Sequence, residues 1–382
     1  MQTSYEPISE EEFDRIYRSS LVKKRLRSQV EELKLTQFFD PYGLFVGDEL
    51  RLVIGETVVT GGVRDQERQF LVVGQAIVPP EYRRQGTLRA AASDIVDSCK
   101  QRDVPFAILR ENKDGFYRQY GVRPVVDRRT WQCQPAELLS VIDEYTGEFH
   151  ELHLKDWKQL QSIHSQYIDQ FSLTLQRTET HWRWILSDDF GESYRTTVWM
   201  KEGAPRGYVV YNVDDNQLVE IDSGYIDTEA LCHILYYLGL HEPECETVVF
   251  EGPDRGRVFN LVGGGAECRV SPEVCLMVVD VASALGCIAA PPTESVLVSV
   301  SQQLESEKEM FEIKNNGEVK RRPTVSDPDV SLNSGTLAQL AAGYRSPSEL
   351  NKFGDIKFET KFGRKMFERM FPKRLPFVRD NI

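Results

Sequence analysis

One segment, residues 75–89, constrains the fold of this chain more than any other, because it joins an apolar strand to an amphipathic helix through a short basic loop. Residues 70–73 and 76–78 are predicted to form a buried strand, which the following Pro-Pro pair ends because proline has no N–H to donate to a sheet. The apolar residues that come next recur at helical spacing along one stripe: Leu88, Ala91, Ala92, Ile95, Val96 and Cys99. They predict a helix that begins at or just after Gly86.

The start of this helix is a candidate anion site. A helix start presents N–H groups without intrahelical partners and the positive end of the helix dipole. Gly86 has no Cβ, so a ligand can approach the backbone closely there. Arg83, Arg84 and Arg89 add positive charge in a chain whose formal net charge is -13. The segment therefore predicts a site for a phosphate-bearing ligand, and the alternative is a solvated basic turn that leads into an ordinary helix.

The elements after this helix continue the pattern. Residues 105–110 predict a second short strand, and residues 114–121 predict a short aromatic helix that ends in glycine. The order of strand, basic glycine loop, helix, strand and aromatic helix resembles the acetyl-CoA core of the GNAT acetyltransferases. In that family an Arg/Gln-x-x-Gly-x-Gly/Ala loop holds the pyrophosphate, and a Phe-Tyr-x-x-x-Gly helix carries a tyrosine beside the thioester sulfur.

The loop narrows the resemblance further. Arg83 and Gly86 fit the GNAT pattern, but Leu88 replaces the small residue at its last position and Arg89 follows. This variant is similar to the loop of the enhanced intracellular survival (Eis) family. Three further pieces match that family in the same order: residues 173–177 with Trp182, residues 277–281 and residues 337–344.

The Eis resemblance implies an α/β (α+β) fold with two GNAT-like mixed-sheet domains in tandem, followed by a sterol-carrier-like α+β domain. We expect the N-terminal GNAT domain with the acetyl-CoA site at residues 1–125, the second GNAT-like domain at residues 126–288 and the sterol-carrier-protein-like domain at residues 289–382. The second copy carries Asp222 and Asp227 where the first has its arginines. Because carboxylates repel a pyrophosphate, the second domain is expected to lack the cofactor site.

The resemblance also implies roles for individual residues. Tyr117 is the expected general acid, because a phenol with a pKa near ~10 stays protonated until a thiolate with a pKa near ~8.5 departs. A core tyrosine is the alternative. The expected base is the carboxylate of Ile382, since the Eis family uses its C-terminal carboxylate. Expected cofactor contacts are the backbone of Ala76, Ile77 and Val78, the loop residues Arg84, Gln85, Gly86, Thr87, Leu88 and Arg89, and Asn112 and Lys113.

Length and composition limit the remaining possibilities. A chain of 382 residues is long enough for two or three domains. It has no apolar run near the ~20 residues of a membrane span and no signal-peptide pattern, so a cytoplasmic protein is expected. The seven cysteines are scattered without a Cys-x-x-Cys pair, which predicts neither a metal site nor a disulfide framework. The acidic balance argues against nucleic acid as a partner.

These observations lead to an expected acetyl-CoA-dependent N-acetyltransferase, with acetyl-CoA as co-substrate and no metal. The acceptor is expected to be a primary amine on an aminoglycoside, a polyamine or a lysine side chain. The alternative is a non-catalytic acyl-CoA- or lipid-binding protein that retains the GNAT fold. No stable membrane insertion is expected, because the apolar face of the terminal helix is predicted to pack on its own domain. The resemblance implies a homo-oligomer, in the Eis family a hexamer.

Overall fold

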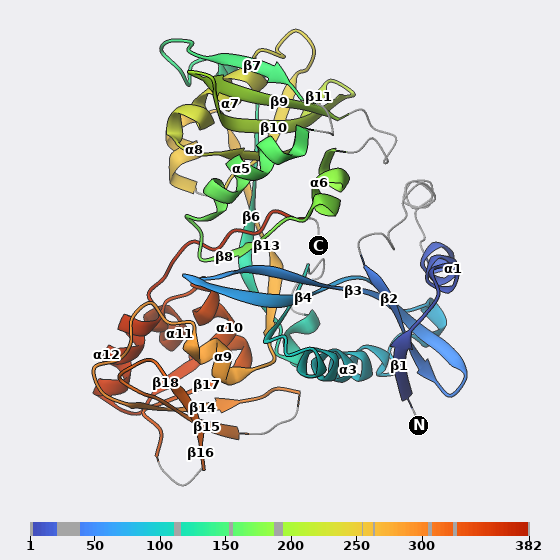
Figure 1. Ribbon diagram of the computed structural model, residues 1–382, viewed down its shortest axis with the longest axis vertical. Helices are drawn as coiled ribbons and strands as arrows, with labels where there is room; N and C mark the ends of the chain where they lie inside the picture. The colour runs from blue at the N-terminus through green and yellow to red at the C-terminus, as the bar shows by residue number, and fades with distance from the viewer. Residues whose placement is uncertain are drawn as a thin grey trace. The chain divides into compact units, whose positions relative to one another are not determined.

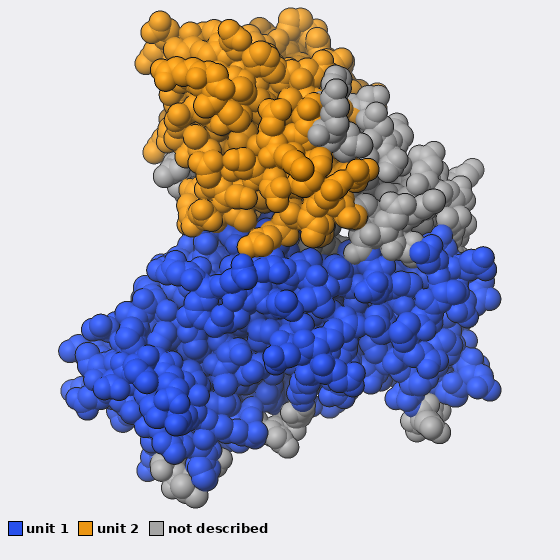
Figure 2. Space-filling model, in the orientation of Figure 1, with its two compact units in different colours: residues 1–126, 171–175, 272–382 blue, residues 127–170, 176–271 orange. Residues whose placement is uncertain are grey.

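The computed structural model describes residues 3–20, 39–110, 116–152, 156–186, 194–253, 255–262, 264–304, 308–323 and 327–380. The chain forms two compact units, coloured separately in Figure 2. Unit 1 comprises residues 1–126, 171–175 and 272–382, and unit 2 comprises residues 127–170 and 176–271. Neither unit is continuous along the chain. The expected contiguous division at residues 125 and 288 remains a prediction.

The N-terminal sheet of unit 1 is built around one parallel strand pair. Its strand order is β1 (Thr3–Pro7), β2 (Asp40–Val46), β3 (Glu49–Val63), β4 (Gln66–Ile77), β5 (Phe106–Arg110) and β13 (Glu267–Val278), and β8 (Leu173–Leu175) pairs with the end of β3. Helix α3 (Thr87–Gln101) connects β4 to β5, which run parallel, while the other neighbours are antiparallel (Figure 1). Among the described residues, the remaining elements here are α1 (Glu10–Ser20) and the 3-10 helices η2 (Pro80–Tyr82) and η3 (Phe116–Tyr120).

Helix α3 packs on this sheet through the stripe that the sequence predicts. It begins at Thr87 with Gly86 as its N-cap, which confirms the expected start. Ala91, Ile95 and Cys99 are between 0% and 8% exposed. They contact apolar side chains from three strands: Leu52, Ile54, Leu71, Val73, Ala107 and Leu109. Burying a side chain such as isoleucine contributes roughly 1.5–3 kcal/mol, so tertiary packing holds the helix in place.

In its described residues, the C-terminal module of unit 1 has its own sheet and four helices. The strand order is β16 (Val319–Arg322), β15 (Lys308–Ile313), β14 (Val296–Ser301), β17 (Val330–Asn333) and β18 (Ile356–Phe358). The helices are α9 (Val281–Gly286), α10 (Ser334–Ala342), α11 (Pro347–Phe353) and α12 (Lys361–Met370). Ser346 and Glu349 form a reciprocal capping box at the start of α11. Helix α12 buries Met366, Phe367 and Met370, which confirms that its apolar face packs within the chain.

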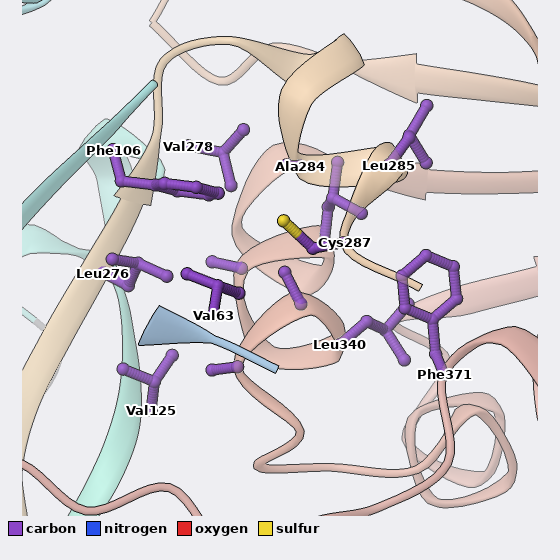
Figure 3. Packing of buried hydrophobic residues seen from close by; sticks show 14 of the residues in the cluster. Val63, Phe106, Val125, Leu276, Val278, Ala284, Leu285, Cys287, Leu340 and Phe371 are labelled. Atoms are coloured by element: carbon purple, nitrogen blue, oxygen red, sulfur yellow. The ribbon is translucent and has the colours of Figure 1, made fainter. Parts of the chain in front are cut away.

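One hydrophobic core is shared by the N-terminal sheet and the C-terminal module of unit 1. Figure 3 shows Phe106 from β5 in the same cluster as Leu340 from α10 and Phe371 after α12. Arg64, in the β3–β4 hairpin, also crosses into the module, where it donates hydrogen bonds to the carbonyls of Leu340 at 2.7 Å and Pro372 at 3.0 Å. Burial lowers the pKa of Arg64 to about 10, so the guanidinium stays charged at neutral pH.

Unit 2 repeats the arrangement of the first sheet. Its strand order is β6 (Arg123–Cys133), β12 (Thr247–Glu251), β11 (Gln217–Tyr225), β10 (Ala204–Asp214), β9 (Arg195–Lys201) and β7 (Glu148–Glu151). Its helices are α4 (Pro135–Leu138), α5 (Trp157–Ile168), α6 (Glu179–Leu186), α7 (Thr228–Gly239) and α8 (Arg255–Val262). The pair β11 and β12 is parallel and is connected by α7, as β4 and β5 are by α3.

The two copies exchange their last strands. Strand β13 follows the helices of unit 2 in the sequence, yet it pairs with β5 of unit 1 from Val274 opposite Arg110 to Val278 opposite Phe106. Strand β6 follows the first copy, yet it pairs with β12 of unit 2. This exchange explains why neither unit is continuous along the chain.

Candidate cofactor and acyl-transfer site

Strand β4 contains a bulge just after the residues that pair with β5. In the register of β3 and β4, Val53 lies opposite Ile77 and Gly55 lies opposite Gly74, so β4 contains one extra residue. Gln75 lies in this bulge with φ 53°, in the left-handed region. The pairing of β4 with β5 ends at Val73, opposite Leu109. Among the described residues the two strands have no pairing beyond this point, and we call this unpaired end of the strand pair the gap.

Tyr17 and Phe39 hold the bulge in place. The Tyr17 hydroxyl, on α1, donates a hydrogen bond to Oε1 of Gln75. Phe39 packs against the neighbouring glycine so closely that a Cβ added to Gly74 would lie 2.9 Å from its ring. Glycine is therefore required at this position.

The bulge also corrects the sequence analysis at residues 76–78, for which a buried strand was predicted. Ala76 is exposed, and Ile77 and Val78 are half-buried. These residues extend β4 past its last pairing with β5, so their backbone borders the gap. Arg83 donates from Nε to the carbonyl of Val78 at 3.0 Å and so ties the following loop to this segment.

The loop after β4 presents the start of α3 to solvent. Arg84, Gln85 and Gly86 are exposed, and the backbone is left-handed at Arg84 (φ 61°) and Gly86 (φ 82°). The amides of Arg89 and Ala90 donate to the Gly86 carbonyl at 3.0 and 3.1 Å. The N–H groups before them precede the first intrahelical donor. A Cβ added to Gly86 would meet no atom within 4 Å, so the space in front of this helix start is open.

Two further residues of the predicted site anchor the first turn of α3. Thr87 is 7% exposed and donates from its hydroxyl to the carbonyl of Tyr82 at 3.2 Å. Leu88 is half-buried and packs on the cluster beneath α3, which gives its side chain a structural role. Arg89 is exposed at the end of this turn.

Arg51 is a cation beside the loop that the sequence analysis missed. Its Nη1 donates to Oε1 of Gln85 at 3.3 Å, its Nη2 pairs with Glu49 at 2.9 Å, and its guanidinium lies 5.1 Å from the ring centroid of Tyr82. Arg51 comes from β3, more than 30 residues before the loop in the sequence. No local motif links them, because only the pairing of β3 with β4 brings them together.

A buried carboxylate fixes the other end of α3. Glu56, on β3, is 0% exposed and accepts hydrogen bonds from Tyr5 at 2.6 Å and Ser98 at 3.3 Å, with Arg102 at 3.0 Å. Burial raises the pKa of Glu56, and these partners oppose that rise. The network ties the last turn of α3 to β3, and nothing in the local sequence predicts it.

The expected aromatic helix is a single 3-10 turn, η3, followed by Gly121 with φ 84°. Tyr117 and Tyr120 are half-buried and pack against the hydrophobic cluster beneath α3. Burial raises the pKa of Tyr120, and the charge of Arg89 partly offsets that rise, which places this turn near the start of α3. Asn112 and Lys113 lie outside the described residues.

The C-terminal segment reaches the end of β5. Ile382 lies outside the described residues, but Arg379 is 8% exposed, and its carbonyl accepts a hydrogen bond from Nη2 of Arg110 at 2.9 Å. Arg110 is the last residue of β5, one position after the last pairing with β4. Residue 379 is therefore held at the end of β5, beside the gap between β4 and β5.

In the second copy, Glu220 lies at the bulge that corresponds to that of β4, and Asp227 lies at the helix start that corresponds to that of α3. Strand β11 has the same irregularity, because Val210 lies opposite Asp222 and Tyr211 lies opposite Glu220. Glu220 is 5% exposed and accepts a hydrogen bond from the amide of Glu251, at the end of β12, at 2.7 Å.

The start of α7, which corresponds to the start of α3, is capped. Asp227 accepts a hydrogen bond from the amide of Ala230 at 2.8 Å and forms an ion pair with Arg206. Burial raises the pKa of Asp227, but these two partners outweigh it and hold the pKa below its usual value. The helix start therefore already has its own anion.

A pocket of about 720 Å³ lies at the opposite end of α3 from the loop, within unit 1. Side chains of both charges line it, among them Arg68, Lys100, Asp103, Asp280 and Glu309. It borders Cys99 and not Gly86, so it is not part of the candidate cofactor site.

The described residues meet neither the requirements of a metal site nor those of a membrane-spanning helix. Within those residues, no three His, Cys, Asp or Glu side chains are grouped to hold a metal ion. None of the helices in the described ranges is both long and apolar enough to cross a membrane. All seven cysteines are free thiols.

This chain is similar to one protein-domain family over its C-terminal part and to several solved structures over its whole length. Residues 279–379 match the sterol carrier protein domain family. A GCN5-related N-acetyltransferase from Anabaena variabilis is similar with a TM-score of 0.86 at 16% identity, covering 100% of both chains. Eis1 from Mycobacterium abscessus has a TM-score of 0.80 at 18% identity and also covers 100% of both. A GCN5-related N-acetyltransferase from Kribbella flavida has a TM-score of 0.80 at 18% identity, covering 100% of this chain and 98% of its own. No curated protein matches the sequence.

At these identities the similarity establishes the fold. The chain has two GNAT-like mixed-sheet domains in tandem and a sterol-carrier-like α+β domain at its C-terminal end. The fold class expected from the sequence is confirmed.

Proposed function

We propose that this protein is an acetyl-CoA-dependent N-acetyltransferase that acts on primary amines. The observation that carries the proposal is one continuous stretch of chain with an opened strand pair at one end and an open helix start at the other. The backbone of Ala76, Ile77 and Val78 suits the amides of a pantetheine arm, as an added strand would. The helix start at Gly86 suits a pyrophosphate, because its N–H groups and dipole favour anions.

The charges around the loop support this assignment. Arg84 and Arg89 are exposed beside Gly86, and Arg51 lies behind Gln85. Four guanidinium groups, counting Arg83, therefore surround a helix start in an otherwise acidic chain. Charge-assisted hydrogen bonds from arginine to phosphate oxygens are among the stronger polar contacts in proteins.

The second copy supports one cofactor site per chain. Glu220 borders the strand pair of that copy and Asp227 caps its helix start. Acetyl-CoA would have to displace the carboxylate of Asp227 from the amide of Ala230 before its own phosphates could bind there. The proposal therefore assigns the reaction to the first copy alone.

The reaction requires three tasks. A primary ammonium with a pKa near ~10.4 must lose a proton before its nitrogen attacks the thioester carbonyl. The carbonyl carbon then forms a C–N bond, and the C–S bond breaks. The departing thiolate takes up a proton, so the products are an amide and free CoA thiol.

Two residues are proposed for the proton transfers. The carboxylate of Ile382 takes the proton of the ammonium, since Arg379, three residues before it, is held by Arg110 beside the gap. The phenol of Tyr117 protonates the thiolate, since its turn packs next to the start of α3. Asn112 and Lys113 are kept as proposed cofactor contacts.

The acceptor is proposed to be an aminoglycoside, a polyamine or a lysine side chain. The fold neighbours described as N-acetyltransferases support the amine class but do not distinguish among these. The cytoplasm is the proposed compartment, because all seven cysteines are free and disulfides form in oxidising compartments. A homo-oligomer, and specifically a hexamer, is proposed from the Eis resemblance.

The alternative is a non-catalytic acyl-CoA- or lipid-binding protein, and its lipid-binding form receives less support. The module that would bind lipid has a closely packed core, in which Val298, Leu337, Phe367 and Phe371 are each 0% exposed. The pocket of about 720 Å³ has several charged side chains in its wall, which is unsuited to an acyl chain.

The proposal is tested by measuring CoA thiol release from acetyl-CoA over a panel of amines. At least one primary amine is expected to be acetylated, and mass spectrometry identifies the product. Tyr117→Phe removes only the phenolic proton and is expected to lower kcat by about 10²-fold with little change in the KM for acetyl-CoA. Tyr120→Phe is the matched control in the same turn. An unchanged kcat for Tyr117→Phe with every active amine rules out its role as the acid.

The terminal base is tested by appending one alanine after Ile382. The extension displaces the carboxylate by ~3.5 Å and keeps the preceding sequence intact. Amidation of the native terminus, by ligation, removes the charge without lengthening the chain and serves as the second variant. Both are expected to reduce kcat. Full activity in both variants would exclude the carboxylate.

A further inference from the structure

The last ten described residues, 371–380, form a docked segment that we name the C-terminal strap. The amide of Ser172 donates to the carbonyl of Leu375 at 2.9 Å, and the amide of Phe377 donates to the carbonyl of Leu173 at 3.1 Å. Phe377 and Val378 are 7% and 5% exposed, and the ring of Phe377 lies 5.0 Å from that of Phe171. The strap therefore pairs with the chain around β8 as an additional strand would.

The N-terminal part of the strap is held by contacts of Lys373 and Arg374 on the surface. Arg374 forms two hydrogen bonds of 3.0 Å with the carboxylate of Asp65, and its amide donates to Gly343 at 2.9 Å. Lys373 pairs with Glu349 at 2.7 Å. These contacts hold the first half of the strap but lie away from the gap in the sheet.

The lower end of the strap meets Arg110. The guanidinium bridges two groups: Nη1 contacts Oε1 of Glu273 at 3.3 Å, and Nη2 donates to the carbonyl of Arg379 at 2.9 Å. The side chains of Arg110 and Glu273 are only 14% and 17% exposed. Glu273 is on β13, next to Val274, which pairs with Arg110 across the two strands. The strand exchange thus supplies the carboxylate that orients this arginine.

We infer that Arg110 is a positioning residue for acyl transfer, because it clamps the C-terminal strap at the point where β4 and β5 separate. This inference rests on the proposed function, in which the end of the chain supplies the base. Residues 380–382 span at most about 10 Å when fully extended. Because Arg110 holds the carbonyl of Arg379, it limits how far from this point a carboxylate at residue 382 can reach.

Arginine is suited to this task and lysine is not. A planar guanidinium presents two N–H donors in a fixed fork, so one side chain can bridge the carboxylate of Glu273 and the carbonyl of Arg379. A lysine ammonium keeps the charge and reaches one of these partners at a time. Arg110→Lys is therefore expected to retain part of the function, and Arg110→Gln less.

The first measurement is hydrogen exchange of the full-length protein by mass spectrometry, which needs no substrate. Arg110→Gln is expected to accelerate exchange at residues 378–382 at least tenfold and to leave residues 372–376 unchanged. Glu273→Gln, which keeps Arg110 and its bond to Arg379, should produce a smaller acceleration at the same residues. Arg374→Gln is the matched control, since it removes an arginine pair from the same strap but away from the gap.

The second measurement is steady-state kinetics with the best amine of the panel. Arg110→Gln is expected to lower kcat at least tenfold with an unchanged KM for acetyl-CoA, Arg110→Lys to recover part of the loss, and Arg374→Gln to match the native chain. A general loss of stability would also affect the KM for acetyl-CoA and the exchange of β4 and β5.

The outcomes separate the clamp from the proposed function. Unchanged exchange at residues 378–382 in Arg110→Gln overturns the clamp, whatever the activity. Accelerated exchange with an unchanged kcat overturns its role in positioning. If the native chain acetylates no amine, the proposed function fails and the positioning role fails with it, while the exchange data still decide whether Arg110 holds the strap.

Discussion

Replacing Gly86 with alanine isolates the part of the site on which the proposal most depends. Gly86 has φ 82° and ψ 3°, a left-handed conformation that costs a residue with a Cβ roughly 1–2 kcal/mol. The loss of backbone freedom in the unfolded chain returns about 0.4–1 kcal/mol, so the net loss of unfolding free energy is about 1 kcal/mol. No atom lies within 4 Å of an added Cβ, so no steric clash within the protein contributes.

Gly354 is a matched control for this backbone effect. It has φ 77° and ψ 11° at the end of α11, and a Cβ added there also meets nothing within 4 Å. Gly354→Ala should therefore lose the same ~1 kcal/mol of unfolding free energy as Gly86→Ala. The two variants differ only in where the strain and the new methyl group are placed.

Binding of CoA then distinguishes the two variants. At residue 86 the methyl group occupies the open space before the helix start, and relief of the strain shifts the amides that would contact the pyrophosphate. We expect the Kd of CoA, measured by calorimetry, to rise at least tenfold in Gly86→Ala, which corresponds to about 1.4 kcal/mol. Gly354→Ala should bind CoA like the native chain. An unchanged Kd in Gly86→Ala, at the expected loss of stability, would refute the placement of the pyrophosphate at this loop.

Two further predictions concern buried groups. Arg177 and Asp222 form a bidentate ion pair at 2.6 and 3.1 Å, and their side chains are 2% and 3% exposed. Asp222→Ala leaves the guanidinium of Arg177 buried without this partner and should lower the unfolding free energy of unit 2, measured in urea, by roughly 3–5 kcal/mol. A loss below ~1 kcal/mol would contradict this prediction. Burial raises the pKa of Cys99 to about 12, so its thiol stays protonated at neutral pH and well into the alkaline range. Iodoacetamide should leave Cys99 unmodified in the folded protein from about pH 7 to about pH 9, as measured by peptide mass spectrometry, and rapid native-state labelling would show that the site opens.

Several features of the site follow from the sequence because they depend on a few neighbouring residues. The left-handed turn at Gly86 and the apolar stripe that begins at Leu88 fix where α3 starts and which face it buries. The turn at Asn316 and Gly317 is of the same kind, since Gly317 has φ 85°. Each of these signals acts within one or two turns of chain, where backbone sterics and side-chain spacing suffice.

Other features of the site have no local signal. The bulge at Gln75 puts a residue other than glycine in the left-handed region, and its sequence neighbours predicted an uninterrupted buried strand. Arg51 and Glu56 act on α3 from β3. The roles of Tyr117 and Ile382 came only from the family resemblance, and they remain proposals.

The sequence by itself determined the strand, loop and helix that form the anion site, and the order of elements that implies two copies of one fold. Only the tertiary structure decided that the copies exchange β6 and β13, that Glu273 comes to lie beside Arg110, and that the strap pairs with β8. The physical reason is range. Local backbone preferences are set by adjacent residues, whereas a strand pairing between segments more than 150 residues apart is stable only when the whole core that surrounds it has formed.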